Sequence, residues 1–377
     1  MKRVLIVTHV SGFVPQFEMN NVRILQDLGY EVHYASNYNS PSYGTDNSRL
    51  DGTGIIRHQV DFVRSPFALR ANKEAYLQLK KIMTDISFDL VHCHTPMGGA
   101  LARIAAKATN TKPVIYTVHG FHFFKGASFI NWLIYYPAER YLSRFTDLLV
   151  TINQEDYHRA EKFHANKIQF IPGVGIDYTG INEINIDIAK KREGLGIPRN
   201  HTVILSVGEL IKRKNYETGL RAFAKANLTD STYLICGHGV LKEQLKRLAK
   251  QLGIADKVVF TGYRKDIIEI MKCADIFLFP SYQEGLPAAL MEAMACGLPV
   301  VCSRIRGNTD LIELDKGGYL YHPKDSNGFA RGLINLVKNK ELRSSMRDYN
   351  IKAVKKYSKD QVIGLMKQIY QTIKETE

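Results

Sequence analysis

Cysteine is scarce in this sequence, and the few cysteines are not arranged in pairs. Only five occur in 377 residues, and no two of them form a C-x-x-C motif. Most lie in apolar runs, which favours buried thiols over a disulfide framework. We therefore expect reduced thiols in a cytoplasmic protein, at Cys93, Cys236, Cys273, Cys296 and Cys302.

Long apolar runs are also lacking. The most apolar stretch, residues 129–138, has about half of the ~20 residues that a membrane span requires. The first nine residues, MKRVLIVTH, begin like a signal peptide, but the apolar run is short and no small-residue cleavage site follows it. A first β-strand explains this segment better, and we expect no membrane-spanning segment.

Acidic residues are outnumbered by basic ones. The chain has 51 Lys and Arg against 37 Asp and Glu, a net charge of +14, and no basic tail or arm stands out. Such a charge favours anionic partners, which include a nucleotide diphosphate, a lipid diphosphate, a bilayer surface and a nucleic acid. Charge alone does not choose among them, but no recognised nucleic-acid-binding module is present, so we expect no nucleic acid partner.

Apolar strand-like runs alternate with helical patterns along most of the chain. Repeated strand–helix–strand units predict an α/β protein with parallel, doubly wound sheets and helices on both faces. The length of 377 residues favours two domains over one. The predicted strands are 4–8, 32–35, 90–92, 114–117, 148–152 and 168–171 in the first half, and 203–207, 233–236, 258–261, 276–280 and 300–302 in the second.

The alternation stops after about residue 175 and restarts near residue 201. The polar stretch between them contains Gly194, Gly196 and Pro198, which are typical of a linker. We therefore predict Rossmann-like domains at 1–175 and 201–358, with an interdomain linker at 176–200. Parallel sheets of this kind bind ligands at the carboxyl ends of their strands, so both domains are expected to face one cleft.

The most informative motif is FPSYQEGLPAALMEAMACGLPVV, residues 279–301. A strand ends near Pro280, a turn follows, and Pro287 fits the first position of a helix, where its missing N–H costs nothing. A helix N-terminus offers free amides and about half a positive charge, which suits a diphosphate. Glu284 lies before this helix and Glu292 within it, so one ligand could contact both. An isolated pair of glutamates at this spacing is more often a pair of solvated surface charges, but the surrounding strand, turn, proline, helix and glycine favour a binding role.

The loop after the first strand of the second half is basic. It reads SVGELIKRKN, residues 206–215, with three adjacent cations that could bind phosphates, and Lys214 is the best placed of them. A solvated basic loop is the alternative interpretation. Gly237 and Arg264 follow the next two strands, in GHG and GYR loops, and each of these signals is weak by itself.

Histidines gather at two strand ends of the first half. His119 follows a predicted strand and precedes a glycine, in the run YTVHGFHF, and His92 and His94 end another strand. His in such aromatic surroundings is more often packed than catalytic. Three histidines also suggest zinc, but no cysteine or carboxylate is convincingly placed in the sequence to complete a site. We therefore expect no metal.

Together these motifs resemble the retaining glycosyltransferases of family 4, which have the two-domain GT-B fold. The resemblance covers nearly the whole chain and is most specific at residues 279–301. It implies that Glu284 lies beside the transferred sugar, that Glu292 binds the ribose, that Lys214 clamps the diphosphate and that His119 contacts the sugar. By resemblance, the donor site also includes Gly12, Arg213, Gly237, Arg264, Gly285, Leu286, Pro287 and Ala288.

Two positions depart from the pattern of the family or match it only in part. Glu209 stands where the family commonly has an arginine, although a branch of bacterial polysaccharide enzymes shares the glutamate. Compensation of the diphosphate charge then depends more heavily on Lys214, with help from Arg213. Gly12 matches a loop in which many relatives have two glycines. His122 is expected to lie one layer further from the ligand than His119, and His94 is expected to line the acceptor side.

The resemblance also implies an activity and partners. It is closest to bacterial enzymes that transfer an N-acetylhexosamine to an undecaprenyl-diphosphate-linked sugar. We therefore expect transfer of a hexose or N-acetylhexosamine from a UDP-sugar to a lipid-linked saccharide in cell-surface polysaccharide synthesis, without a cofactor or metal. The aromatic and basic segment 121–140 is expected either to pack on the domain or to contact the inner face of the membrane. The helix at 359–377 is expected to cross back onto the first domain.

Three other classes of protein share some of these features. A non-hydrolysing UDP-sugar epimerase has the same two-domain plan and is the main alternative. A nucleic-acid-binding protein is compatible with the charge alone. A regulatory protein could bind sugar nucleotides without turnover, but the complete set of Glu284, Glu292, Lys214 and His119 argues against it.

Overall fold

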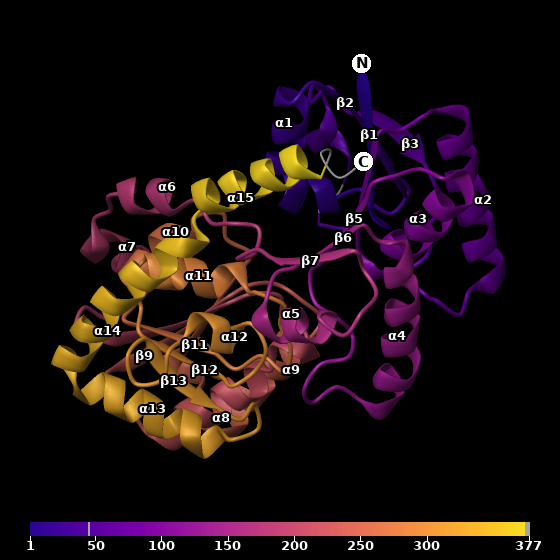
Figure 1. Ribbon diagram of the computed structural model, residues 1–377. Coiled ribbons are helices and arrows are strands. Elements are labelled where there is room, and N and C mark those ends of the chain that lie inside the picture. The colour runs from indigo at the N-terminus through magenta and orange to yellow at the C-terminus, as the bar shows by residue number, and fades with distance from the viewer. Residues whose placement is uncertain (44–45, 374–377) are drawn as a thin grey trace. The chain divides into compact units, whose positions relative to one another are not determined.

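The computed structural model describes residues 1–43 and 46–373, which form two compact units. The first unit comprises residues 1–175 together with the C-terminal segment from residue 360, and the second comprises residues 176–359. Each unit is built around one parallel sheet (Figure 1). The two-sheet α/β fold that the sequence predicts is therefore confirmed.

The first sheet has seven parallel strands in the order β3-β2-β1-β4-β5-β6-β7. Because both faces are covered, the central strands are continuous apolar runs rather than alternating ones. The order reverses direction between β1 and β4, which makes the carboxyl ends of these strands the topological switch point. The strands are β1 Lys2–Val7, β2 Tyr30–Ser36, β3 Ile56–Gln59, β4 Leu90–His94, β5 Val114–Val118, β6 Leu148–Thr151 and β7 Lys167–Phe170.

Helices cover this sheet, and α2 packs alongside α3 (Figure 1). Leu79 of α2 and Ala102 and Ala105 of α3 are fully buried against strand residues such as Leu5. The helices of the unit are η1 Val14–Glu18, α1 Met19–Asp27, η2 Ser48–Leu50, α2 Leu69–Asp85, α3 Pro96–Thr109, α4 Phe129–Leu142, η3 Ser143–Phe145 and α5 Gln154–Ala160.

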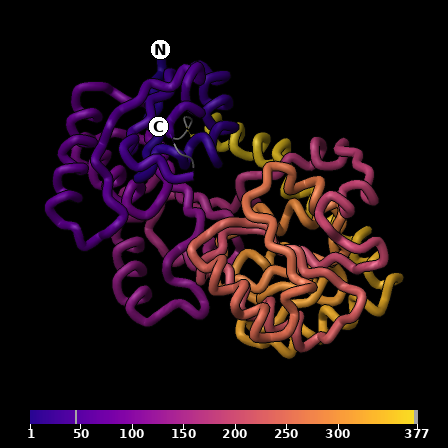
Figure 2. Tube along the Cα trace, turned by 180° about the vertical axis from the view of Figure 1, so that it is seen from behind, coloured from indigo at the N-terminus to yellow at the C-terminus, as the bar shows by residue number. Residues whose placement is uncertain are grey.

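The C-terminal helix α15 (Lys359–Thr372) packs almost entirely with the first unit, although 183 residues or more separate it from the rest of that unit in sequence. The Tyr370 hydroxyl lies 2.8 Å from Nδ1 of His92 on β4, and both side chains are buried. Figure 2 shows the yellow C-terminal segment beside indigo segments of the first unit. A buried polar contact of this kind fixes the register of the helix on the sheet.

The second sheet has six parallel strands in the order β10-β9-β8-β11-β12-β13. Its direction reverses between β8 and β11, so the loops after these two strands meet at the switch point. Those loops carry the basic motif and the 279–301 motif. The strands are β8 Thr202–Val207, β9 Ser231–Cys236, β10 Val258–Gly262, β11 Ile276–Phe279, β12 Val300–Ser303 and β13 Gly318–Tyr321.

Residues 176–200 are part of the second unit rather than a linker between units, so this prediction needs correction. They form α6 (Tyr178–Glu183) and α7 (Ile188–Gly194), and the side chains of Ile181 and Ile197 are buried in the core of the second unit. Asp177 and Asp187 cap the two helices by accepting backbone amide hydrogen bonds. This capping pattern was the available signal for helices in the segment.

The remaining helices of the second unit cover both faces of its sheet, and α8 and α13 lie against each other (Figure 1). They are η4 Lys212–Lys214, α8 Tyr216–Ala226, α9 Lys242–Gln251, η5 Ala255–Lys257, α10 Ile267–Cys273, α11 Ala288–Ala295, α12 Asn308–Leu311, α13 Ser326–Lys338, α14 Lys340–Ala353 and η6 Val354–Tyr357. All five cysteines of the chain are buried and unpaired.

The predicted strands are all present, with ends shifted by up to two residues. Two further strands, β3 and β13, lie at sheet edges and were not predicted. β3 is largely exposed and carries polar residues, so it has no apolar run to mark it. A π-helical turn, Val14–Glu18, directly precedes α1. Among the residues described by the structure, no helix combines the length and apolar character needed to span a bilayer.

Candidate active site

Two cations and one carboxylate converge at the switch point of the second sheet. Lys214 Nζ lies 2.8 Å from Oε1 of Glu284, and Arg213 Nη1 lies 2.9 Å from Oε2. Lys214 comes from the loop after β8 and Glu284 from the loop after β11. The Glu284 side chain is only 8% exposed, so water screens these ion pairs less than it screens surface pairs. The cluster keeps one net positive charge, which suits an anionic ligand.

Several contacts hold the two loops in this arrangement. Asn215 adopts a left-handed backbone conformation (φ 54°), and its side-chain amide donates to the carbonyls of Pro280 and Pro323, each at 2.8 Å. The Tyr282 amide donates to the Arg213 carbonyl at 2.8 Å. The Lys214 ammonium also lies 4.9 Å from the centre of the Phe279 ring. The positions of the cations are therefore set by buried backbone contacts.

Close backbone packing explains the glycines of the neighbouring loop. A side chain at Gly237 would place its Cβ 1.9 Å from the carbonyl oxygen of Gly208, and one at Gly239 would collide with Leu210. The two loops are also joined by the Leu210 amide, which donates to the His238 carbonyl at 2.8 Å. Gly237 thus lies beside the basic loop, where only a glycine allows the two backbones to approach this closely. Glu209 is exposed in the same loop.

The turn before α11 is packed against the loop after β12. Arg306 Nε donates to the Glu284 carbonyl at 3.1 Å, and a Cβ at Gly307 would lie 2.1 Å from the carbonyl oxygen of Gly285. The helix starts at Ala288, one residue later than predicted, and Pro287 is its N-cap rather than its first helical residue. Gly285, Leu286, Pro287 and Ala288 therefore form one continuous turn from Glu284 into the helix.

Glu292 lies inside α11 and is half-buried. Burial raises the pKa of its carboxyl above the usual value, and the nearby charge of Lys359 opposes this shift. A partly buried carboxylate is stabilised when a ligand hydroxyl donates a hydrogen bond to it. The position is compatible with the ribose-binding role that the sequence suggests.

Arg264 pairs with a residue outside the cluster of Arg213, Lys214 and Glu284. Its guanidinium makes two hydrogen bonds to Asp266, at 2.8 and 2.5 Å, and Asp266 also pairs with Lys191 at 2.7 Å. These partners hold the pKa of Asp266 well below its usual range, with the Arg264 hydrogen bond as the largest cause. Arg264, Lys191 and Glu269 line a surface pocket together with α7.

In the first unit, His119 lies at the carboxyl end of β5 and faces two other titratable side chains. Its Nε2 lies 3.2 Å from Nδ1 of His94 on β4 and 3.4 Å from Oε1 of Glu18, and Oε1 also lies 3.6 Å from His94 Nδ1. Glu18 ends the π-helical turn before α1. It was not predicted as a site residue, because a glutamate followed by Asn20 and Asn21 is typical of a solvated helix face.

Burial governs the protonation of this cluster. It raises the pKa of Glu18 to about 8, a shift that the hydrogen bond from Asn21 opposes. It lowers the pKa of His119 to about 4 and that of His94 well below the usual value. Both imidazoles are therefore neutral at neutral pH, and each has one nitrogen lone pair to offer. Within the described chain, Glu18, His94 and His119 form the group that could hold a metal ion.

Gly12 and His122 both make close contacts within the first unit. Gly12 is buried, its amide donates to the Pro41 carbonyl at 2.6 Å, and a Cβ there would lie 1.8 Å from the carbonyl oxygen of Ser42. The absence of a side chain at Gly12 therefore leaves room for the backbone of residues 41–42 in the same unit. His122 stacks on Tyr135 of α4, with ring centres 4.7 Å apart.

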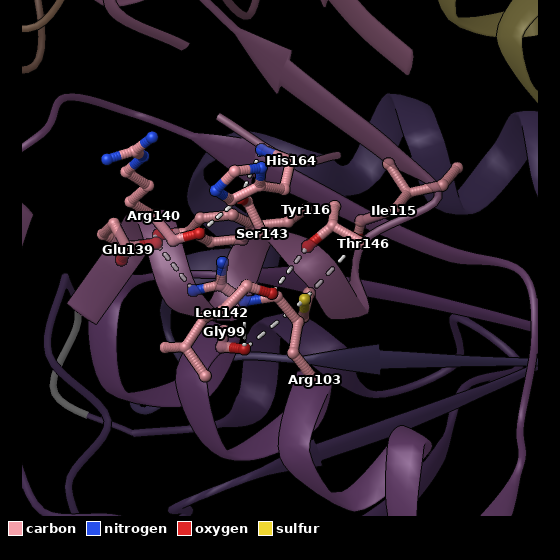
Figure 3. A network of polar contacts seen from close by, with 11 residues as sticks. Gly99, Arg103, Ile115, Tyr116, Glu139, Arg140, Leu142, Ser143, Thr146 and His164 are labelled. Carbon is pink, nitrogen blue, oxygen red and sulfur yellow. Dashed lines mark hydrogen bonds and ion pairs between the residues drawn. The ribbon is translucent and has the colours of Figure 1, made fainter. Parts of the chain in front are cut away.

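The helix α4 combines a buried anchor with an exposed apolar surface. Arg103 of α3 is fully buried and pairs with Glu139 of α4 at 2.8 Å, while its Nε donates to the Gly99 carbonyl at 2.9 Å (Figure 3). The guanidinium also lies 3.9 Å from the centre of the Tyr116 ring. On the other side, Phe129, Ile130 and Leu133 are 77%, 64% and 63% exposed.

Comparison with known proteins identifies the family. A model described as "Glycosyl transferase 4-like" matches residues 3–153, and one described as "Glycosyl transferases group 1" matches residues 187–353. EpsD of Bacillus subtilis (strain 168), named as a glycosyltransferase, is 33% identical over 98% of this chain and 96% of its own length. The chain therefore belongs to the family-4-like glycosyltransferases, and the resemblance found in the sequence is confirmed.

A second relative has a more specific name. The UDP-Gal:alpha-D-GlcNAc-diphosphoundecaprenol alpha-1,3-galactosyltransferase of Escherichia coli is 29% identical over 80% of each chain. Among solved structures, Anabaena Alr3699/HepE in complex with UDP superposes with a TM-score of 0.79 at 20% identity, covering 100% of both chains. At that identity the likeness shows the fold. These relatives give no support to the epimerase alternative.

Proposed function

We propose that this glycosyltransferase takes its sugar from a UDP-sugar and transfers a hexose or N-acetylhexosamine with retention of the anomeric configuration. Two relatives suggest the nucleotide: the Anabaena protein was solved in complex with UDP, and the Escherichia coli relative is named for a UDP-Gal donor. Retention is what the family resemblance implies.

The cluster of Lys214, Arg213 and Glu284 at the switch point carries this proposal. When the bond between sugar and phosphate breaks, negative charge develops on the nucleoside diphosphate. Two cations fixed by backbone contacts, and the turn 285–288 that leads into α11, stabilise this charge without rearranging. No metal ion is then needed to stabilise the charge of the diphosphate. The Glu292 carboxylate accepts hydrogen bonds from the ribose hydroxyls.

The remaining roles concern the sugar. Glu284 orients the sugar and stabilises its developing positive charge, because its carboxylate is buried beside the diphosphate site. His119 holds a sugar hydroxyl. In a retaining reaction of this kind, the acceptor hydroxyl attacks on the side of the leaving group, and the phosphate oxygen takes its proton. Gly237 and Arg264 follow neighbouring strands of the second sheet and complete the donor site, and two hydrogen bonds to Asp266 orient the Arg264 guanidinium.

The acceptor is proposed to be a saccharide linked to a polyprenyl diphosphate, in the synthesis of a cell-surface polysaccharide. The Escherichia coli relative is named for such an acceptor, and so is an N-acetylgalactosaminyltransferase of Campylobacter jejuni that is 34% identical over 38% of this chain and 40% of its own length. A lipid diphosphate also matches the net charge of +14.

Such an acceptor lies in a bilayer, and α4 offers a surface to meet it. Phe129, Ile130 and Leu133 form an exposed apolar patch, and the exposed cations Lys125 and Arg140 lie on the same segment. Apolar side chains with adjacent cations are typical of segments that lie in the interface of an anionic membrane. We place the protein in the cytoplasm, attached peripherally to the inner face of the membrane.

One experiment tests donor, acceptor and reaction together. The protein is incubated with a panel of UDP- and GDP-sugars and short polyprenyl-diphosphate-linked saccharides, and the products are identified by mass. The proposal predicts an acceptor heavier by one hexose or N-acetylhexosamine, with UDP-sugars only. A donor isomerised in the absence of any acceptor would instead indicate an epimerase.

A further inference from the structure

We propose that His94 is a positioning residue that fixes the tautomer of His119. It donates a hydrogen bond from its Nδ1 to Nε2 of His119, which leaves the proton of the His119 ring on Nδ1, the nitrogen open to a ligand. Both histidines lie at strand ends of the first sheet, His94 as the last residue of β4 and His119 directly after β5. The inference rests on the proposed function for one point, that His119 contacts the sugar.

The tautomer of His94 follows from its other ring nitrogen. His94 is 1% exposed, and its Nε2 is buried with no hydrogen-bond partner in the described part of the chain. The ring of His92 lies next to it, with centres 4.1 Å apart, but both nitrogens of His92 are engaged by Tyr370 and Thr117 at 2.8 Å. As for backbone groups, an orphaned buried N–H is rarer than an unpaired buried acceptor. The proton of His94 therefore lies on Nδ1.

That proton has His119 as its acceptor. Nε2 of His119 lies 3.2 Å from Nδ1 of His94, whereas Oε1 of Glu18 lies 3.6 Å away, which is too far for a hydrogen bond. A ring nitrogen that accepts a hydrogen bond carries a lone pair, so the His119 ring is neutral and its single proton lies on Nδ1. The partner of one ring nitrogen thus decides the role of the other.

The protonated nitrogen of His119 is available to a ligand. Among residues 1–43 and 46–373, none forms a hydrogen bond with Nδ1 of His119, and this side chain is 22% exposed at the edge of a pocket. Phe13 packs against both rings, with centres 4.9 Å from His119 and 5.7 Å from His94. This packing restricts the rotation of the two imidazoles, so the direction of the Nδ1–H bond is fixed as well.

The third titratable side chain of the cluster supports this tautomer. Oε1 of Glu18 lies 3.4 Å from Nε2 of His119, and a charged carboxylate at this place would attract the proton to Nε2. Burial raises the pKa of Glu18 to about 8, which disfavours the charged form at neutral pH. The other oxygen, Oε2, accepts a hydrogen bond from the Asn21 side chain.

The consequence for the reaction is a neutral hydrogen-bond donor beside the sugar. Nδ1–H of His119 donates to the oxygen of a sugar hydroxyl and orients it without placing a charge there. Positive character develops on the sugar as its bond to phosphate breaks, so an imidazolium at this position would oppose the reaction. The other tautomer would present a lone pair and could only accept a hydrogen bond from the hydroxyl.

The tautomers can be measured without any transfer assay. The full-length protein is labelled with ¹⁵N-histidine, and long-range ¹H–¹⁵N spectra at neutral pH distinguish a protonated ring nitrogen from one with a lone pair. Spectra of His119→Asn and His94→Asn assign the two rings among the 12 histidines. We expect both rings to be neutral, each with its proton on Nδ1. His158→Gln, on an exposed residue of α5, is the control and should leave both rings unchanged.

Two substitutions at His94 separate its hydrogen bond from its bulk. His94→Leu removes the donor, and the His119 proton should then move to Nε2, next to Glu18. His94→Asn keeps a donor, because its Nδ2 is attached to Cγ as Nδ1 is, and should keep the His119 proton on Nδ1. Circular dichroism checks that both variants are folded.

The same variants connect the tautomer to the sugar. Calorimetric titration compares UDP with the UDP-sugar that is transferred in the donor panel. In His94→Leu, affinity for the UDP-sugar should fall about 2–12-fold, the worth of one hydrogen bond, while affinity for UDP stays constant. His94→Asn should recover most of the loss.

Two results would overturn the role of His94: a proton on Nε2 of His119 in wild type, or a folded leucine variant that keeps this proton on Nδ1. Equal losses of affinity for UDP and for the UDP-sugar would instead overturn the sugar contact of His119, and with it that part of the proposed function. The spectra decide the tautomer in either case.

Discussion

Lys214 and Glu284 form a nearly buried ion pair, 2.8 Å from Nζ to Oε1, although 70 residues separate them in sequence. The pair joins the loops after β8 and β11 at the point where the strand order reverses. Because a diphosphate and the Glu284 carboxylate are both anions, they compete for the same ammonium group. This competition predicts opposite effects on nucleotide binding when each partner is removed.

Lys214→Ala should weaken binding of UDP. A charged hydrogen bond is worth about 1.5–3 kcal/mol, which corresponds to a loss of about 10–150-fold in affinity. Calorimetric titration with UDP measures the change. Lys212→Ala is the matched control, because this neighbouring lysine is exposed and forms no ion pair in the described part of the chain. Equal losses in the two variants would contradict a specific role for Lys214.

Glu284→Ala should abolish transfer but not nucleotide binding. Loss of one group that stabilises charge in a transition state costs about 10²–10³-fold in kcat. UDP binding should be unchanged or tighter, because Arg213 and Lys214 lose the carboxylate that competes with phosphate. Turnover and the dissociation constant of UDP are measured on the same preparation. Transfer at the wild-type rate would refute the assignment.

Glu292→Gln should stabilise the protein while it weakens UDP binding. Burial raises the pKa of Glu292 in the folded state, so ionisation costs stability as pH rises through that pKa. The variant should therefore melt at a higher temperature than wild type at pH 8, and this difference should shrink as pH falls toward 4.5. Thermal melts across this pH range give the answer, and a difference that does not depend on pH would contradict it.

The buried pair of Arg103 and Glu139 predicts a strong effect on folding. Glu139→Ala leaves a fully buried guanidinium unpaired and should cost about 3–5 kcal/mol in the free energy of unfolding. The double variant Arg103→Met with Glu139→Leu should recover most of this loss. Glu74→Ala removes an exposed ion pair and should cost less than about 0.5 kcal/mol. Urea denaturation compares the four proteins, and a double variant no more stable than Glu139→Ala would count against the explanation.

The exposed face of α4 predicts membrane binding. Phe129→Ser combined with Leu133→Ser should reduce co-sedimentation with vesicles that contain anionic lipid, because both side chains are more than half exposed. Leu314→Ser, on an exposed leucine of the second unit, is the control and should leave binding unchanged. If the α4 variant sediments as wild type does, this helix is not the membrane surface.

The sequence predicted the two sheets well because buried parallel strands are continuous apolar runs. It also placed Lys214 and Glu284 at strand ends, and the switch-point topology then brings them together. It missed β3, whose residues are polar at a sheet edge, and it missed the contribution of Glu18. That glutamate turns inward because a π-helical turn precedes α1, a local geometry that helical periodicity does not reveal.

The linker prediction for residues 176–200 failed for a different reason. Glycines and polar side chains suggested a linker, yet Asp177 and Asp187 each cap a short helix, and Ile181 reaches the core of the second unit. Helices of six and seven residues have too few positions for an apolar period to be visible. The capping residues carried the only local signal.

The most direct test of the central claim is a crystal structure of the protein with a bound UDP-sugar. We expect the diphosphate to lie within hydrogen-bonding distance of the Lys214 ammonium and at the start of α11, with the ribose at Glu292. A nucleotide bound elsewhere, with Lys214 still paired only to Glu284, would contradict the proposed donor site.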